Sequence, residues 1–286
     1  MLHTVPAQHL IKHAGALACA LAPDGDCVVS AGLSMVALWE YGTWRPIWST
    51  KIADEIFGVS FSPSGRIVSV ACEGTVLCLS AADGSTKVRL AGPKRYIFRA
   101  VVDEADEFVV SAGDDRTVRL WDLSTGAQVS LFKAHKKAVL DVAFATGAKR
   151  FISVSADGQV MAWSTENRAP DWATQVSTLP LTSCAVVGGL VLTAGTSREL
   201  CLLDVDSGVV RRKLPVAGAD AARCAQFDNN TAVIGTKGQV QLVRLADGSV
   251  ERELLGPTSV VWDLSSAPAE RRVACASDGV FVWSDV

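Results

Sequence analysis

Short apolar runs alternate with turn signals along the whole chain. The run Cys27–Ser30 is rich in β-branched residues, and Pro23, Asp24 and Gly25 before it favour a tight turn. Similar signals recur about every 8–12 residues, a spacing typical of short antiparallel strands. No segment carries the apolar period of a helix convincingly. The pattern therefore predicts an all-β fold.

One strand phrase recurs along the chain and is clearest at Val118–Asp122. Equivalent register positions fall at intervals of 40 to 42 residues, at Trp39, Leu79, Trp121, Trp163, Leu203, Val243 and Trp283. A period of about 40–45 residues with four strands per copy is the sequence signature of a propeller blade. The sequence predicts a seven-bladed β-propeller of four-stranded antiparallel blades, with residues 1–286 forming a single domain.

The last copy of the repeat is incomplete, because Trp283 lies three residues from the end of the chain. The last blade thus lacks its fourth strand, while the stretch from Thr4 to Lys12 precedes the first inner strand without an assignment. We expect this stretch to pair as the outer strand of the last blade. Such pairing closes the ring and leaves no free edge there.

The segment Ser111–Asp122 resembles the consensus of WD-repeat propellers. The next copy carries His135, Ser153, Asp157 and Trp163 at the positions of the structural tetrad of that family. The resemblance implies a buried chain of hydrogen bonds from Trp to Ser to His to Asp, which locks the strands of a blade. A buried polar network stabilises a fold only when all its members are bonded.

Other copies depart from this pattern. Leu79, Leu203 and Val243 replace the tryptophan, so these blades must rely on apolar packing. The copies with partial tetrads have the residues Ser111, Asp115 and Trp121 with Pro93 near the histidine position, and His13, Ser30 and Trp39 without an aligned aspartate. The dipeptide Trp262-Asp263 is predicted on an inner strand and is not the repeat's own Trp-Asp.

Composition narrows the class of protein. The chain has 286 residues, 49% hydrophobic and 20% charged, with a formal net charge of -3, so it has no global attraction to nucleic acid or anionic membranes. Its eight cysteines lack zinc-binding spacing and read as buried thiols in a reducing compartment. We expect a soluble intracellular protein, cytoplasmic or nuclear, without a signal peptide or a membrane span.

Catalytic interpretations are weak. His135, Ser153 and Asp157 are the residue types of a nucleophilic triad, but they coincide with the structural tetrad. His9 and His13 lack a third zinc ligand, and Asp103–Glu107 lacks the pattern of a calcium loop. No enzyme activity, metal or cofactor is expected.

The resemblance implies that partners bind at the top face, near the central channel. The alignment of repeats places Gly58, Arg99, Asp141 and Trp262 at one equivalent position. The predicted partner-binding residues are Arg95, Tyr96, Arg99, Asp114, Arg116, Lys136, Lys137, Asp141 and Trp262. Aromatic and arginine side chains are enriched at interface hot spots. The alternative is that Trp262 plugs the channel and the charges are solvated. Trp44, Trp48 and Trp172 indicate either packing at the rim or a contact surface on the side.

The sequence favours a non-catalytic scaffold or adaptor for one or more proteins or peptides. The propeller itself is expected to be monomeric within a larger hetero-complex, without membrane insertion. A nucleic-acid-associated subunit is the alternative, and an enzyme or small-molecule binder that uses the channel is favoured less. The basic clusters that bear on this choice are Lys133, Lys136 and Lys137; Lys149 and Arg150; Arg211, Arg212 and Lys213; and Arg271 and Arg272. Each is expected to be solvated unless several converge on one face.

Overall fold

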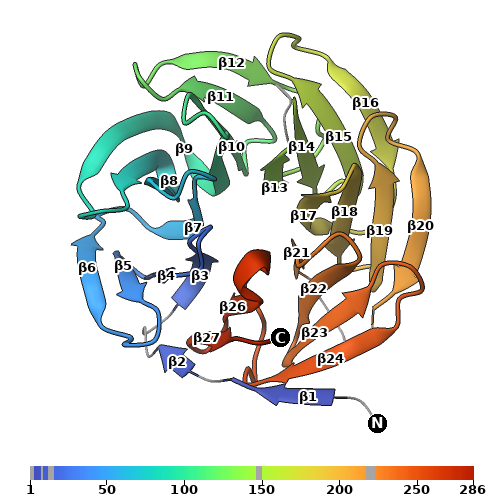
Figure 1. The fold of residues 1–286 in the computed structure, drawn as a ribbon. Helices are drawn as coiled ribbons and strands as arrows, with labels where there is room; N and C mark the ends of the chain where they lie inside the picture. The colour runs from blue at the N-terminus through green and yellow to red at the C-terminus, as the bar shows by residue number, and fades with distance from the viewer. Residues whose placement is uncertain (1–2, 8, 12–15, 146–149, 217–222) are drawn as a thin grey trace.

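The computed structural model describes residues 3–7, 9–11, 16–145, 150–216 and 223–286. These residues form β-strands and one short 3-10 turn, with no α-helix among them. Figure 1 shows the sheets following one another around a ring in chain order. The prediction of an all-β protein with four-stranded antiparallel sheets is therefore confirmed.

Four-stranded antiparallel units recur along the chain, from the first strand near the axis to the fourth strand outside. The first sheet comprises β3 (Ala16–Leu21), β4 (Cys27–Gly32), β5 (Met35–Glu40) and β6 (Pro46–Lys51). Two later sheets comprise β13 (Val139–Phe144), β14 (Arg150–Ser155), β15 (Gln159–Ser164) and β16 (Pro170–Gln175), then β17 (Leu181–Val187), β18 (Leu190–Gly195), β19 (Glu199–Asp204) and β20 (Val210–Pro215). The next sheet contains β21 (Arg223–Gln226), β22 (Thr231–Thr236), β23 (Gln239–Arg244) and β24 (Val250–Leu255).

Between the first of these sheets and β13 lies a six-stranded sheet. It comprises β7 (Ile56–Phe61), β8 (Ile67–Ser80), β9 (Thr86–Val102), β10 (Phe108–Gly113), β11 (Val118–Asp122) and β12 (Gln128–Phe132). The strands β8 and β9 are 14 and 17 residues long, against six for most others. The first half of β9 pairs with β8 and its second half pairs with β10. Each long strand therefore covers two strand positions of the repeat.

The chain ends in β25 (Asp263–Ala267), the 3-10 turn η1 (Pro268–Glu270), β26 (Arg272–Ala276) and β27 (Val280–Trp283). The N-terminal strand β2 (His9–Ile11) pairs antiparallel with β27 as the fourth strand of that sheet. The strand β1 (His3–Pro6) instead pairs parallel with β24 of the preceding sheet. The expectation that one strand from Thr4 to Lys12 pairs with the last blade is therefore wrong for its first part, and Lys12 lies outside the described residues.

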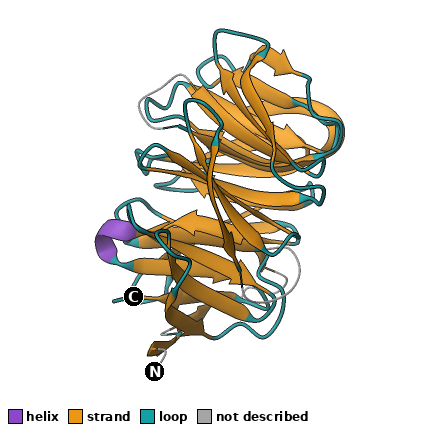
Figure 2. Ribbon diagram, turned by 90° about the vertical axis from the view of Figure 1, so that its right-hand side faces the viewer, coloured by secondary structure: helices purple, strands orange, loops and turns teal. Residues whose placement is uncertain are grey.

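The loops gather at two opposite faces of the ring, which Figure 2 shows from the side. We define the top face by the starts of the inner strands β3, β7, β13, β17, β21 and β25, together with the start of the second half of β9. Because neighbouring strands are antiparallel, the turns between second and third strands lie at the same face. The 3-10 turn η1 follows the end of β25 and so lies at the opposite face.

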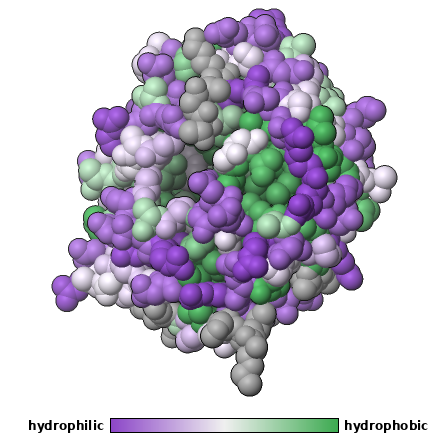
Figure 3. Space-filling model, turned by 45° about the vertical axis from the view of Figure 1, so that its right-hand side comes forward, coloured by the Kyte–Doolittle hydropathy of each residue, from purple (hydrophilic) through white to green (hydrophobic). Residues whose placement is uncertain are grey.

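Apolar side chains fill the space between neighbouring sheets. One cluster joins Val110 and Leu120 of one repeat to Phe151 and Trp163 of the next, and all four are buried. In the space-filling view of Figure 3, the surface is mostly hydrophilic, with a hydrophobic patch beside a hollow. All eight cysteines are free thiols, seven of them buried. No helix in the described ranges is long and apolar enough to cross a bilayer.

Two outer-strand tryptophans lock neighbouring sheets together. The Trp48 indole N–H donates to the Ala81 carbonyl at 2.8 Å, and Trp172 donates to Val205 at 3.0 Å. Each ring packs on the glycine of the neighbouring turn, Gly84 or Gly208, where a Cβ atom would come within 2.7 or 2.4 Å of the ring. These contacts support the interpretation of Trp48 and Trp172 as rim packing. Trp44 stacks edge-on against Tyr41, with ring centroids 4.9 Å apart.

Candidate functional site

Several inner strands carry one extra residue where they begin at the top face. The pairing of β13 with β14 skips Leu140, and the equivalent strands skip Leu17, Phe57 and Phe98. Such bulges re-aim a side chain away from the regular alternation of a strand. We call Leu17, Phe57, Phe98, Leu140 and Trp262 the apolar collar, because they line one cavity of about 290 Å³ on the axis.

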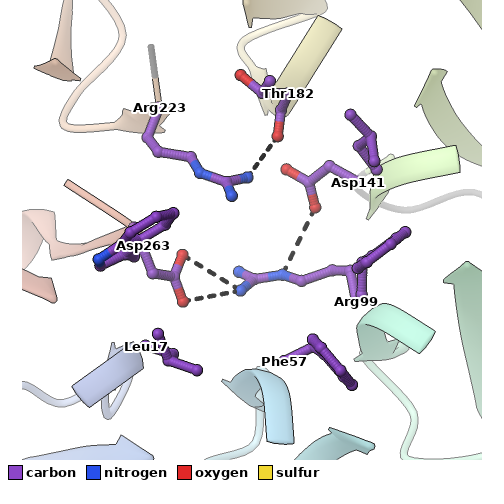
Figure 4. Close-up of a pocket in the computed structure, with 10 residues that line it drawn as sticks. Leu17, Phe57, Arg99, Asp141, Thr182, Arg223 and Asp263 are labelled. Carbon is purple, nitrogen blue, oxygen red and sulfur yellow. Dashed lines mark hydrogen bonds and ion pairs between the residues drawn. The ribbon is translucent and has the colours of Figure 1, made fainter. Parts of the chain in front are cut away.

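Charged side chains from the next position of the strands lie below this collar. Arg99 Nη1 approaches Asp263 Oδ2 at 3.2 Å, and Arg99 Nε lies 3.6 Å from Asp141 Oδ1. Figure 4 shows these side chains converging from different strands. We call Arg99, Asp141 and Asp263 the axial ion cluster. Their side chains are only 23%, 10% and 13% exposed, so water screens the cluster weakly.

Backbone groups complete the bonding of both carboxylates. The Cys184 N–H donates to Asp141 Oδ2 at 2.9 Å, and the Cys19 N–H donates to Asp263 Oδ2 at 3.3 Å. Since these donors belong to β17 and β3, the cluster ties together strands from well-separated parts of the chain. Burial raises the pKa of Asp263 and Arg99 opposes it, leaving the pKa above its ordinary value. Burial lowers the pKa of Arg99, but Asp263 and Asp141 raise it more.

The axial ion cluster separates two cavities. Its three residues line the upper cavity and also a lower one of about 520 Å³ on the side of the opposite face. Trp262 lines only the upper cavity, and 47% of its surface is exposed. The charged cluster therefore lies between the two cavities, whereas Trp262 lies on the wall of the upper one. Arg223 also lines the upper cavity and donates from Nη1 to the Thr182 carbonyl.

The alignment of Trp262 with Arg99 and Asp141 is wrong by one residue. Asp263 pairs with Ala276 as Arg99 pairs with Ala112, so Asp263 holds the equivalent position and Trp262 precedes it. The strand β25 begins only at Asp263, so the alignment of the repeats by residue number is shifted by one there. Asp263 of the dipeptide starts an inner strand, as predicted, whereas Trp262 lies just before that strand. Asp263 and Arg223 were not predicted as site residues, although both hold the same repeat position as Arg99.

The other predicted partner-binding residues lie at the top face. Tyr96 is 44% exposed, and its ring centroid lies 5.0 Å from that of Phe57. Arg95 forms a 3.1 Å ion pair with Asp114. Three further predicted residues are exposed, namely Arg116, Lys136 and Lys137. Whether this set binds a partner stays a prediction, whereas Arg99 and Asp141 already have bonds within the fold.

The predicted tetrad is present with the expected contacts. Trp163 Nε1 donates to Ser153 Oγ at 2.8 Å, Ser153 Oγ lies 2.8 Å from His135 Nε2, and His135 Nδ1 lies 3.2 Å from Asp157 Oδ2. Burial lowers the pKa of His135 more than Asp157 raises it. The neutral imidazole therefore donates from Nδ1 to the carboxylate and accepts the Ser153 hydroxyl proton at Nε2. Ser153 is fully buried and its Oγ also accepts the Trp163 N–H, so the hydroxyl is not accessible to a substrate.

The partial tetrads keep only part of this network. Trp121 donates to Ser111 at 2.9 Å and Trp39 donates to Ser30 at 2.8 Å. Asp115 pairs with Arg119 at 2.6 Å instead of a histidine. His13 lies outside the described residues. Leu79, Leu203 and Val243 are at most 4% exposed, as expected for apolar replacements of the tryptophan.

Most basic clusters away from the channel are neutralised by local partners. Arg150 contacts Asp171 and Asp206, Arg211 contacts Asp204, and Lys213 contacts Glu199. Arg272 lies 3.6 Å over the ring of Tyr41. Lys149 lies outside the described residues. Within the described ranges, no group of three or more His, Cys, Asp or Glu side chains could hold a metal ion.

Comparison with known proteins adds the family. A family model described as "Outer membrane protein assembly factor BamB" matches residues 34–263. This range spans six of the seven register positions, from Trp39 to Val243. The chain belongs to this family of β-propeller proteins. Its repeats are WD repeats, as the tetrad and the curated relatives show.

The curated relatives of this propeller are larger proteins. "Periodic tryptophan protein 2" of Arabidopsis thaliana is 27% identical over 225 residues, which cover 68% of this chain and 25% of the relative. "Transcription initiation factor TFIID subunit 5" of Caenorhabditis elegans is 25% identical, covering 49% and 22%. "DDB1- and CUL4-associated factor 10" of Homo sapiens is 25% identical, covering 46% and 24%. The propeller thus matches about a quarter of the length of each of these three relatives.

Proposed function

We propose that the chain is a non-catalytic docking platform that binds protein or peptide partners at its top face. The observation that carries this proposal is the exposed aromatic surface around the axial cavity. Phe57, Phe98 and Tyr96 contact one another there, and Trp262 lies on the cavity wall. Tryptophan and tyrosine that are half exposed lose much apolar surface when a partner covers them.

The platform is a single closed domain of seven blades in this proposal. The long strands β8 and β9 each supply two strands, so the six-stranded sheet with its divided strands makes two blades. The pairing of β2 with β27 supports closure of the ring between the first and last parts of the chain. A closed ring leaves few unpaired edges, which suits a monomeric propeller inside a hetero-complex.

The relatives support a role within assemblies. Two of their names describe a subunit of a transcription initiation factor and a factor associated with other proteins. The residue types of a nucleophilic triad are already committed to the tetrad, which supports a platform without catalysis. Free buried thiols favour an intracellular location, cytoplasmic or nuclear.

An association with nucleic acid is the second candidate. It is favoured by exposed basic residues at the top face, Arg116, Lys136 and Lys137, which have no ion-pair partner in the described part of the chain. The pairing of Arg150, Arg211 and Lys213 with acids weakens it for the outer surface. Binding to nucleic acid would fall steeply with salt, because it releases counterions.

Recovery of the tagged protein from its own cells at mild salt, followed by mass spectrometry, tests the platform. We expect a stable set of partners that Trp262→Ala and Tyr96→Ala lose without unfolding. Ile47→Ala is the matched control, because Ile47 is also 47% exposed but lies on the outer strand β6. Recovery of the bare protein, or loss of partners only with Ile47→Ala, would overturn docking at the top face.

A further inference from the structure

We infer that the axial cavity receives a carboxylate side chain from an extended segment of a partner, with Arg223 as the residue that reads its charge. This inference rests on the proposed docking function and adds the chemistry of the partner. Four features around one cavity support it: carboxylates that are already hydrogen-bonded, an arginine with N–H donors that have no partner among the described residues, the apolar collar, and exposed basic residues at the rim.

The acidic residues of the cavity already use most of their acceptor sites within the fold. Asp141 accepts from the N–H groups of Val142 and Cys184, both at 2.9 Å, besides its contact with Arg99. Asp263 accepts from the Leu264 N–H at 3.0 Å, from a second backbone N–H, and from Arg99. An arriving lysine or arginine would find these oxygens bonded and a guanidinium beside them.

Arg223 has the opposite character. A guanidinium carries five N–H donors, and among the described residues Arg223 donates only to the Thr182 carbonyl. It is partly buried in the wall of the upper cavity, and it does not line the lower one. A carboxylate that enters from the top face can therefore accept the remaining donors. Charge-assisted bonds of this kind are about twice as strong as neutral ones.

The size and lining of the cavity fit a side chain rather than a folded surface. Its volume of about 290 Å³ equals the share of about ten liquid waters. The apolar collar surrounds the approach to Arg223, so apolar residues next to the acid would be covered there. A short segment with an acid flanked by leucine or phenylalanine would match both Arg223 and the apolar collar.

The charge of the surrounding face fits an acidic segment as well. Six exposed basic residues in turns and connections of this face have no ion-pair partner in the described ranges: Arg116, Lys133, Lys136, Lys137, Arg198 and Lys237. Among the described residues, the acids without an ion pair on the same face are Glu55, Glu73 and Asp278. The positive excess would raise the rate at which an acidic segment arrives.

Selection from a phage-displayed library of random nonapeptides on the full chain tests this inference. We expect enriched peptides to carry Asp or Glu next to an apolar residue. A synthetic copy of the best peptide should bind at least about tenfold more weakly after its acid is replaced by the amide. The unchanged peptide should lose about the same factor when it binds the Arg223→Gln variant. Arg212→Gln, an exposed arginine on the outer strand β20, is the matched control and should bind as the unaltered protein does.

The outcomes separate the two proposals. Selected peptides that lose binding with Trp262→Ala but carry no acid, or ignore Arg223→Gln, would overturn the carboxylate site and leave the docking face standing. No enriched peptide, or binding that both variants leave unchanged, would count against both proposals. Tight binding of oligouridylate that depends on Arg223 would replace the acidic peptide by single-stranded RNA.

Discussion

Replacing Arg99 by glutamine removes the cation of the axial ion cluster and keeps most of the side-chain volume. Breaking a buried ion pair by deleting one partner costs roughly 3–5 kcal/mol, because the remaining charge stays buried. Here both Asp141 and Asp263 keep two backbone N–H donors, and Arg99 is 23% exposed. Because these contacts partly compensate the remaining charges, we expect the loss of unfolding free energy to lie near the lower end of this range, at about 3 kcal/mol.

The pH dependence of this loss has a definite sign. Burial holds the pKa of Asp263 above its ordinary value even beside Arg99, and removal of Arg99 raises the pKa further. A carboxyl whose pKa is higher in the folded state contributes stability below its unfolded pKa and loses it as pH rises through the folded value. The deficit of the variant should therefore be largest at pH 7 and shrink as pH falls toward about 4.

Urea unfolding of the two proteins at pH 7 and pH 5 measures the effect. Arg212→Gln is the control, since exposed substitutions usually change stability by less than about 0.5 kcal/mol. Adding Asp141→Asn and Asp263→Asn to Arg99→Gln should recover much of the loss, because no buried carboxylate is then left without Arg99. An Arg99→Gln variant as stable as the Arg212→Gln control, or equally destabilised at both pH values, would refute this account of the cluster.

Two further predictions concern packing within and between the sheets, and both are measured by urea unfolding. Ser153→Ala should lower the unfolding free energy by about 2–3 kcal/mol, because two buried partners lose their bonds, whereas Ser111→Ala should cost about 1 kcal/mol since it strands a single donor. Equal losses would contradict the tetrad. Gly84→Ala should lower the unfolding free energy by over about 2 kcal/mol, because φ is +71° and the new Cβ atom would clash with Trp48. Gly42→Ala should cost about 1 kcal/mol, because φ is +85° but the space around it is open. The reverse order would refute the packing of Trp48 on Gly84.

Regular periodicity made the sheets and the tetrad predictable. The interval of 40 to 42 residues places Trp163, and the family pattern then locates His135, Ser153 and Asp157. The bulges that build the apolar collar leave no such mark, because an extra residue such as Leu140 does not disturb the alternation of a short apolar strand. The error at Trp262 arose in the same way, from counting residues across an irregular strand start.

The N-terminal pairing was only partly predictable for a related reason. The repeat pattern predicts that an N-terminal strand completes the last sheet, and β2 holds that place. The sequence contains no signal for the parallel pairing of β1 with β24. The strand β1 has only four residues, and it pairs with the sheet that precedes the last one. Local sequence patterns specify which segments form strands. Which strand an additional strand pairs with depends on which sheet edge lies near it in the folded chain.

The tetrad and the axial ion cluster act on different parts of the fold. The tetrad joins strands β14 and β15 to the connection before β13, so it stabilises one sheet. The cluster instead joins β3, β9, β13, β17 and β25, which belong to different sheets. Buried ion pairs contribute little net stability compared with apolar packing, but they penalise arrangements that separate the partners. A chain with three tryptophan-free repeats thus gains from charges that hold the order of its sheets, and the same pairing leaves Arg223 as the arginine with donors for a ligand.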